Sequence, residues 1–511
     1  MDLLHAPCFF LDKKAEGFSF RSVHSGCVGE DTAPSLRKRT GFSCDDQPFD
    51  RTAQNAVSSF SVRKRIECIE ECHVAGMAVC QIVVMGAVEN EKVMAQRRVI
   101  VIGAGAAGLM AAGQAALAGA DTLLLEKMSR PGRKLAITGK GRCNITNIAE
   151  LADFIDHFGT TGPFLRQAFS LFFTPELMDF LASLGLELVV ERGGRVFPAS
   201  GKAPDVLKML LQWVKQCGVH ITPSSPVEDL AISEGRITGV VSRGRPISCD
   251  AVILATGGAS YPATGSTGDG YRLAESAGHT VIAIRPALVP LETAGGAARK
   301  MAGLDLRNIA VTMLRNGKKY RRAFGEMSFT EFGVTGPVIL TLSGAIVDAI
   351  RKRHAISLSL DLKPALDEKK LDDRLLRDFA SRNREPFGSV LRGLLPAAAI
   401  PVCLEATHIP HDRRGDSITA KERRRLRTWL KDFRLDVTGH RPFTEAIVTA
   451  GGVNTREIDP RTMASRLTEG LYIAGELLDI QADTGGYNLQ AAFSTGWIAG
   501  RSAGQGGQVC S

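Results

Sequence analysis

A glycine-rich turn is the feature of this sequence that most directly indicates chemistry. Gly103, Gly105 and Gly108 are spaced Gly-x-Gly-x-x-Gly directly after the apolar run 99–102. In this pattern the first glycine permits a sharp strand-to-helix turn, the second lets the backbone approach a pyrophosphate, and the third lets the helix pack against the strand. The following helix offers free N–H groups to phosphate oxygens. The turn therefore predicts a dinucleotide site.

An acidic residue follows at the expected distance. Glu126 lies 23 residues after Gly103, at the end of the next apolar segment, 122–125. A carboxylate there can accept hydrogen bonds from ribose hydroxyls, which favours an unphosphorylated adenosine ribose such as that of FAD or NAD.

The elements that must position these residues follow from hydrophobic patterning. A strand over 99–102, a helix over 109–117 and a strand over 122–125 form a βαβ unit of about 28 residues. The patterning also predicts strands over 186–190, 236–241, 251–255 and 471–473, helices over 204–216, around 368–382 and around 421–433, and a final helix after a glycine loop.

Four further segments bear on the choice between FAD and NAD. Residues 130–147 are rich in Gly, Arg, Lys and Asn, a composition that can wrap an extended cofactor with backbone amides and cationic side chains. Residues 255–258, Ala-Thr-Gly-Gly, follow an apolar strand, and the glycine-containing segments 470–479 and 485–492 lie near the end of the chain.

With these segments, the chain resembles a family of bacterial and archaeal flavoproteins known as NAD(P)/FAD-dependent oxidoreductases or aminoacetone-oxidase-like proteins, one branch of which reduces conjugated double bonds in 3-oxo bile-acid intermediates. The resemblance covers about 97–504 and includes Gly-Arg-Val-Phe-Pro at 194–198, Phe-Thr-Glu-Phe-Gly-Val-Thr-Gly-Pro at 329–337 and Val-Thr-Ala-Gly-Gly-Val at 448–453. Glu331 departs from the pattern, since many members have His there.

The resemblance implies an α/β fold: a Rossmann-type FAD-binding core of the two-dinucleotide-binding-domain type, interrupted by an inserted domain with β-barrel and helical parts. We expect 94–284 and 441–511 to form the core and 285–440 to form a basic substrate domain. Residues 1–93 carry scattered Cys, Ser, Asp and Arg without a sustained period, so we expect a poorly structured extension.

The resemblance also implies roles for individual residues. The turn would hold the pyrophosphate, Glu126 the adenosine ribose, the backbone of Val227 the adenine, and the start of the last helix the flavin pyrimidine. The cofactor-binding residues expected on this basis are Gly103, Gly105, Ala106, Ala107, Gly108, Glu126, Lys127, Arg133, Lys134, Thr138, Gly139, Arg142, Asn144, Val227, Thr256, Gly257, Gly475, Glu476, Gly486, Tyr487, Asn488 and Leu489.

The implied function is that of an FAD-dependent oxidoreductase exchanging hydride with a small organic substrate, with NAD(P)H-driven reduction of an activated C=C bond as the leading hypothesis. Alternatives are an amine or hydroxyketone oxidase, and a tRNA-linked or redox-sensing flavoprotein. Only one Gly-x-Gly-x-x-Gly turn is present, so NAD(P)H would dock transiently. No catalytic acid or base is assigned. We expect no metal, because Pro410 interrupts the pair His408 and His411.

The charge of the chain is concentrated in one region. Residues 285–440 contain 29 Lys and Arg against 18 Asp and Glu, an excess of 11 that contains the whole net charge of +9. Without a recognisable nucleic-acid module we expect a solvated surface or a site for an anionic reactant, and no nucleic-acid partner. No apolar run is long enough for a membrane span, and neither a secretory signal nor paired cysteine spacing is evident, so we expect a cytoplasmic protein.

Overall fold

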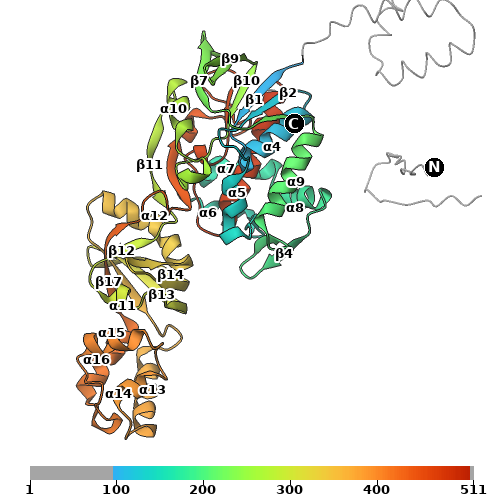
Figure 1. The fold of residues 1–511 in the computed structure, drawn as a ribbon. Coiled ribbons are helices and arrows are strands. Elements are labelled where there is room, and N and C mark those ends of the chain that lie inside the picture. Colours follow the sequence, from blue (N-terminus) through green and yellow to red (C-terminus); the bar gives the residue numbers. More distant parts are fainter. Residues whose placement is uncertain (1–95, 507–511) are drawn as a thin grey trace, which may run out of the picture. The chain divides into compact units, whose positions relative to one another are not determined.

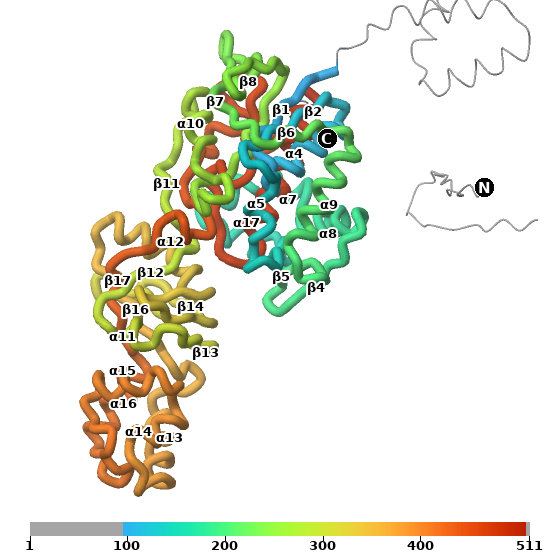
Figure 2. Tube along the Cα trace, in the orientation of Figure 1, coloured from blue at the N-terminus to red at the C-terminus, as the bar shows by residue number. Residues whose placement is uncertain are grey.

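The computed structural model describes residues 96–506, all of which belong to one compact unit. The expectation that the extension 1–93 is poorly structured lies outside the described residues. Figures 1 and 2 show the ribbon and the chain trace.

A parallel five-stranded sheet lies at the centre of the nucleotide-binding part, in the strand order β19-β10-β1-β2-β6. Its central strands are almost wholly apolar and buried, as a sheet covered on both faces requires. The strands are β1 (Arg98–Ile102), β2 (Asp121–Leu125), β6 (His220–Thr222), β10 (Ala251–Leu254) and β19 (Leu471–Ile473).

Helices and two small antiparallel sheets complete this part. The sheets have the orders β3-β5-β4 and β7-β8-β9. The helices are α4 (Ala106–Leu117), α5 (Arg133–Ile137), α6 (Leu151–Asp156), α7 (Gly162–Leu171), α8 (Thr174–Ser183), α9 (Ala203–Gln216), α10 (Asp269–Ser276) and α17 (Tyr487–Gly504), and the strands are β3 (Thr146–Asn147), β4 (Leu188–Glu191), β5 (Arg195–Pro198), β7 (Val227–Ser233), β8 (Arg236–Ser242) and β9 (Arg245–Ser248).

Helices α4 and α17 come from opposite ends of the described chain and pack backbone to backbone. Gly496, Gly500 and Gly504 recur every fourth residue, which places them on one face of α17. A Cβ on Gly496 would lie 2.4 Å from the carbonyl oxygen of Ala107, and one on Gly500 would lie 2.3 Å from that of Ala111. The residue numbers of the contacting pairs increase in the same direction along both helices, so the helices run parallel. Only glycine permits their backbones to come this close.

The chain segment between the two parts of the Rossmann core forms a closed barrel with the strand order β12-β15-β14-β13-β16-β17. It is linked to that part through the antiparallel pair β11 and β18, and it has its own apolar core. The elements are β11 (Val281–Ala287), β12 (Leu291–Thr293), α11 (Ala297–Lys300), β13 (Asp305–Arg315), β14 (Lys318–Phe329), β15 (Gly333–Thr335), α12 (Pro337–Arg351), β16 (Ile356–Asp361), α13 (Glu368–Ser381), α14 (Phe387–Leu391), α15 (Ala399–Thr407), α16 (Ala420–Lys431), β17 (Phe433–His440) and β18 (Val448–Val453).

The predicted architecture, a Rossmann core interrupted by a barrel and helices, is confirmed. The strand predicted over 186–190 corresponds to β4, but β4 pairs in a small antiparallel sheet and not in the Rossmann sheet. The domain limits at 284/285 and 440/441 stay a prediction. We note that β11 runs across the first limit.

The close contact of α4 with α17 makes a testable prediction. In Gly500→Ala the added methyl group would meet the backbone of α4, and such overpacking costs about 1–3 kcal/mol. We therefore expect a lower unfolding temperature in a thermal scan. Gly344→Ala in α12 is the control, because its Cβ would meet nothing within 4 Å; there alanine should leave stability unchanged or raise it. Equal unfolding temperatures for Gly500→Ala and the unsubstituted protein would contradict the packing described.

Candidate functional site

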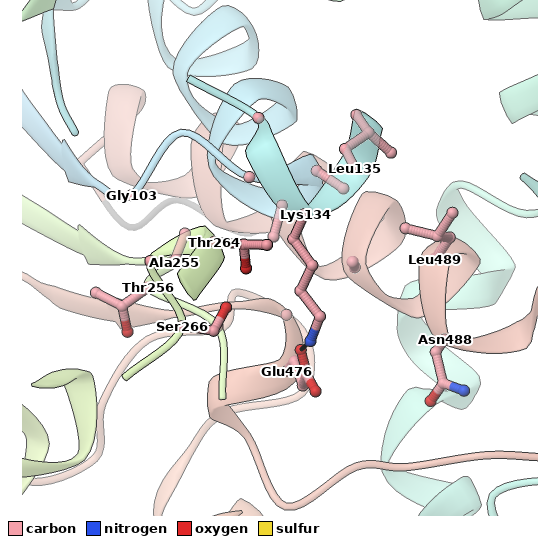
Figure 3. Close-up of a pocket in the computed structure, with 18 of the residues that line it drawn as sticks. Gly103, Lys134, Leu135, Ala255, Thr256, Thr264, Ser266, Glu476, Asn488 and Leu489 are labelled. Carbon is pink, nitrogen blue, oxygen red and sulfur yellow. Dashed lines mark hydrogen bonds and ion pairs between the residues drawn. The ribbon is translucent and has the colours of Figure 1, made fainter. Parts of the chain in front are cut away.

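A large cavity opens at the carboxyl ends of the parallel strands, where doubly wound sheets bind their ligands. Gly103 follows β1, Glu126 follows β2, Thr256 follows β10 and Gly475 follows β19. The parallel pairing brings these four strand ends to one edge of the sheet, although they are far apart in the sequence. Figure 3 shows part of the cavity lining.

The cavity gathers most of the predicted cofactor-binding residues. Those that line it are Gly103, Gly105, Ala106, Ala107, Glu126, Lys127, Arg133, Lys134, Thr138, Gly139, Asn144, Val227, Thr256, Gly257, Gly475, Glu476, Gly486, Asn488 and Leu489.

The three glycines of the turn have different surroundings. Gly103 has φ +99°, and its Cβ would lie 2.6 Å from the carbonyl oxygen of Ala255. A Cβ on Gly108 would lie 1.8 Å from the carbonyl oxygen of Gly103, so that glycine lets α4 pack against the turn. A Cβ on Gly105 would meet no atom within 4 Å, although Gly105 lines the cavity. Only Gly105 thus keeps space free for a ligand.

Glu126 is buried and held by the backbone. Its Oε2 accepts a hydrogen bond from the amide of Ala104 at 2.9 Å, and its Oε1 accepts one from the amide of Met128 at 2.8 Å. Each carboxylate oxygen has a further lone pair. The fixed carboxylate can therefore still accept hydrogen bonds from the hydroxyls of a ribose.

Two lysines of the cavity are each paired with an acid. Lys134 Nζ lies 2.7 Å from Glu476 Oε2, and Lys127 Nζ lies 2.6 Å from Asp269 Oδ2. In Figure 3 the Lys134 side chain extends towards Glu476. Burial opposes ionisation of Asp269, but hydrogen bonds from Lys127 and Thr267 hold its pKa below the usual value. These pairs keep the cavity near electrical neutrality.

The cavity fits an extended dinucleotide. Two buried polar atoms of its lining, Thr256 Oγ1 and Asn144 Oδ1, have no hydrogen-bond partner in the described chain, which suits a polar ligand. The N-termini of α4 and α17 both open on the cavity, with neither a side-chain cap nor an acidic residue in the first turn. Their free amides suit anionic groups.

The packing of the two helices also sets the span between these N-termini. Gly496 of α17 lies against Ala107 of α4, near the start of α4. The N-terminus of α17 therefore projects about eight residues beyond the N-terminus of α4. At 1.5 Å per residue this is an offset of about 12 Å. A pyrophosphate at α4 and a ring system at α17 would be separated by a comparable span, which a five-carbon ribityl chain can bridge.

The binding roles of all the predicted residues stay predictions, and three of these residues do not line the cavity. Gly108 has the packing role described above. Arg142 pairs with Glu191 and lies over the ring of Phe197, and Tyr487 stacks on His157 with ring centroids 3.9 Å apart. Burial raises the pKa of the nearby Cys143 thiol to about 11, so this cysteine is a neutral thiol at physiological pH.

The cavity also contains residues that the motifs did not indicate. An apolar wall of Leu288, Ile447 and Val448 comes from the ends of β11 and β18, and apolar residues there look like any core residue in the sequence. Asp483 and Thr484 lie between the two glycine segments near the end of the chain, so interpolation between those segments could have found them. The others include Ser225, Thr264, Ser266 and Asp269.

Comparisons with known proteins agree with this geometry. A family model described as the HI0933-like protein Rossmann domain matches residues 97–502. The 3-dehydro-bile acid delta(4,6)-reductase of Clostridium scindens is 34% identical over 410 residues, which cover 80% of this chain and 98% of the relative. The chain belongs to the HI0933-like family. The resemblance inferred from the motifs is thereby confirmed.

Other relatives of this chain have a different name. The ribosomal RNA dihydrouridine synthases of Escherichia coli and Haemophilus influenzae are 29% and 28% identical to this chain, cover 78% and 79% of it, and are themselves covered to 96% and 97%. A solved 3-ketosteroid-delta4-(5alpha)-dehydrogenase from Rhodococcus jostii RHA1 is 17% identical and covers 81% of this chain and 99% of its own, at a TM-score of 0.43.

Family membership and cavity together make this protein an FAD-dependent oxidoreductase of the HI0933-like family, as the sequence predicted. Within residues 96–506 no helix is long and apolar enough to cross a membrane. In the same range no cluster of three or more His, Cys, Asp or Glu side chains could hold a metal ion.

The open space at Gly105 can be tested without disturbing the fold. Gly105→Val would project a side chain where we expect the pyrophosphate, so FAD affinity should fall on the order of 100-fold, about 2.7 kcal/mol. The apoprotein should unfold at nearly the same temperature, because a Cβ at this position meets no protein atom within 4 Å.

Gly296→Val is the matched control. Gly296 is also an N-cap glycine with negative φ, and a Cβ there meets only the end of Lys300. It should bind FAD normally in a flavin-fluorescence titration. Normal FAD affinity in Gly105→Val would contradict the predicted position of the pyrophosphate.

Proposed function

We propose that this protein reduces a carbon–carbon double bond conjugated to a carbonyl group, with NAD(P)H as the electron donor. The observation that carries the proposal is what its relatives have in common. One is named as a reductase of the delta(4,6) bonds of a 3-dehydro bile acid, and the others are named for making dihydrouridine. Although a steroid and a nucleobase differ in shape, both names describe hydrogen addition to such a double bond.

Different residues of the cavity would bind different parts of FAD. The first turn of α4 would bind the pyrophosphate, Glu126 the adenosine ribose, and the backbone of Val227, at the start of β7, the adenine. The amides at the start of α17 would lie beside the flavin ring, where the positive end of a helix favours negative charge. When bound, FAD supplies two-electron hydride chemistry that amino-acid side chains lack.

The apolar wall indicates where the substrate would lie. Leu288 and Val448 are nearly buried, and Ile447 is 37% exposed. Val448 begins β18, Ile447 directly precedes it, and Leu288 directly follows β11, so all three lie where the linking strands meet the barrel side. An apolar surface there would exclude water from the reacting atoms and suit a hydrophobic ring system. We therefore propose that the substrate enters between the core and the barrel.

Anaerobic mixing tests the proposed reaction. NADH or NADPH should bleach the flavin absorption of the FAD-loaded protein, and a 3-oxo bile acid with 4,6 double bonds should restore it. A flavin that neither nicotinamide reduces, but that an amine or a hydroxyketone does reduce, would contradict the proposal and favour the oxidase alternative.

A second candidate substrate is a nucleobase in RNA, and a specific surface favours it. The β13–β14 hairpin segment 315–324 contains five basic residues and no acidic one. In the described part of the chain none of the five forms a salt bridge, whereas cations of the neighbouring helices, such as Arg423 and Arg427, pair with Asp372. Exposed Tyr320 and Phe324 lie among them, and aromatic rings between cations suit stacked bases.

A charge-matched pair of variants tests this candidate. Arg321→Glu/Arg322→Glu should weaken binding of a single-stranded RNA oligonucleotide about tenfold at low salt, because on this proposal each cation would neutralise a phosphate. Lys421→Glu/Arg424→Glu changes the same charge on exposed positions of α16 and should have little effect. Fluorescence anisotropy measures both. If the unsubstituted protein does not bind RNA at low ionic strength, this second candidate is excluded.

A further inference from the structure

Reduction of a double bond needs a proton donor. Most charged groups of the cavity are already hydrogen-bonded to the backbone or paired with an opposite charge. The acids and bases that line it are Glu126, Lys127, Arg133, Lys134, Asp269, Glu476 and Asp483. Glu126 is held by backbone amides, and the two lysines are paired with Asp269 and Glu476. Arg133 is a guanidinium, which does not release a proton in proteins. Asp483 remains, and it differs from the others in having a histidine as its partner.

Asp483 and His157 form a hydrogen-bonded pair at the edge of the cavity. Nδ1 of His157 lies 3.2 Å from Oδ2 of Asp483. The face of the imidazole stacks on Tyr487, with an interplanar angle of 21°. The ring is thus held both at one nitrogen and on one face. When Nδ1 donates to a carboxylate, Nε2 is the nitrogen left for other chemistry.

The loop that carries Asp483 is held firmly. The side chain of Asn488 accepts a hydrogen bond from the amide of Ala482 and donates to the carbonyl oxygens of Ala482 and Asp483. Asn147 donates to the carbonyl oxygen of Gly485. These contacts fix the loop just before α17, so the position of Asp483 follows from the backbone.

The pair lies at the end of the cavity where we expect the flavin ring. Asp483 is three residues before the N-cap of α17, whereas the adenosine side is marked by Glu126 and Val227. Since FAD would fill the cavity, a substrate must reach the ring from its open edge. His157 does not line the cavity itself, but it is hydrogen-bonded to Asp483, which does, and its side chain is 34% exposed.

We propose that His157 is the proton donor to the substrate and that Asp483 is its positioning residue, an inference that rests on the proposed function. Saturating one double bond forms two C–H bonds with one electron pair. One hydrogen arrives as hydride from reduced FAD, and the other arrives as a proton from Nε2 of His157 to the neighbouring carbon. The imidazolium becomes a neutral imidazole and regains its proton from solvent, which its exposure permits.

The other ionisable groups around the pair are compatible with this role. Tyr487 packs against the ring, and its pKa is raised by burial and by the charges of Asp483 and Asp153, so its phenol stays neutral. Asp156 precedes His157 at the end of α6, and Asp153 lies one turn earlier. Among the described neighbours, no cation competes for the carboxylate of Asp483 in a salt bridge.

The first experiment needs no substrate. Histidine ¹⁵N NMR of the FAD-loaded protein, with the His157 signals assigned by their loss in His157→Gln, should show a proton on Nδ1. Asp483→Asn keeps the shape of the partner but presents an amide, so this preference should weaken or disappear. His220→Gln, an exposed histidine on β6, is the control and should leave the His157 signals in place. An unprotonated Nδ1, or no response to Asp483→Asn, would overturn the proposed pair.

The second experiment follows the two half-reactions separately, with a 3-oxo-4,6-diene bile acid as the oxidising probe. His157→Gln should slow reoxidation of the flavin on the order of 100-fold and leave its reduction by NADPH unchanged. Added imidazole should partly restore reoxidation in His157→Ala. Wild-type reoxidation rates in His157→Gln would overturn the assignment. If the probe fails to reoxidise even the unsubstituted protein, the proposed substrate class is contradicted, while the NMR result still decides on the pair.

Discussion

The site depends on one contact between two helix backbones. Because Gly496, Gly500 and Gly504 lack side chains, α17 can lie directly against α4 and run parallel to it. Their register places two uncapped helix N-termini on the same cavity, about 12 Å apart along the helix direction. One N-terminus suits a pyrophosphate, and the other suits a ring that becomes negatively charged on reduction. A bulkier residue in this interface would change both the stability and the spacing that the cofactor requires.

The charged side chains of the cavity largely neutralise one another, and polar groups remain available to hydrogen-bond a ligand. Lys127 and Lys134 each face an acid, and Glu126 is held by two backbone amides. The polar atoms left without protein partners, on Thr256 and Asn144, are neutral. The cavity therefore offers FAD directed hydrogen bonds, and its charged groups are already held in place. The pair of His157 and Asp483 is the exception, because Asp483 is paired with an imidazole and not with a lysine or with backbone amides.

The sequence predicted the parts of the site that rest on backbone conformation. Gly103 and Gly108 are required by close approaches of the backbone, and such requirements leave a fixed spacing in the sequence. The strand ends that carry Glu126 and Thr256 could also be predicted, because parallel pairing brings them together. The apolar wall of Leu288 and Ile447 could not, since its residues resemble any core residue and reach the cavity only through the pairing of β11 with β18. The pair of His157 with Asp483 could not be predicted either, because it joins residues 326 positions apart without a motif.

The basic region shows the same limit. Its charge excess is evident from composition, but only the structure separates cations that pair with acids, as on α16, from those of the β13–β14 hairpin that do not. We expect FAD to lie extended along this cavity, with its adenosine near Val227 and its ring at the start of α17. A crystal structure of the FAD-loaded protein tests it most directly. We predict density for the isoalloxazine ring beside Asn488 and Leu489; a ring at the Glu126 end, or FAD outside this cavity, would contradict the account.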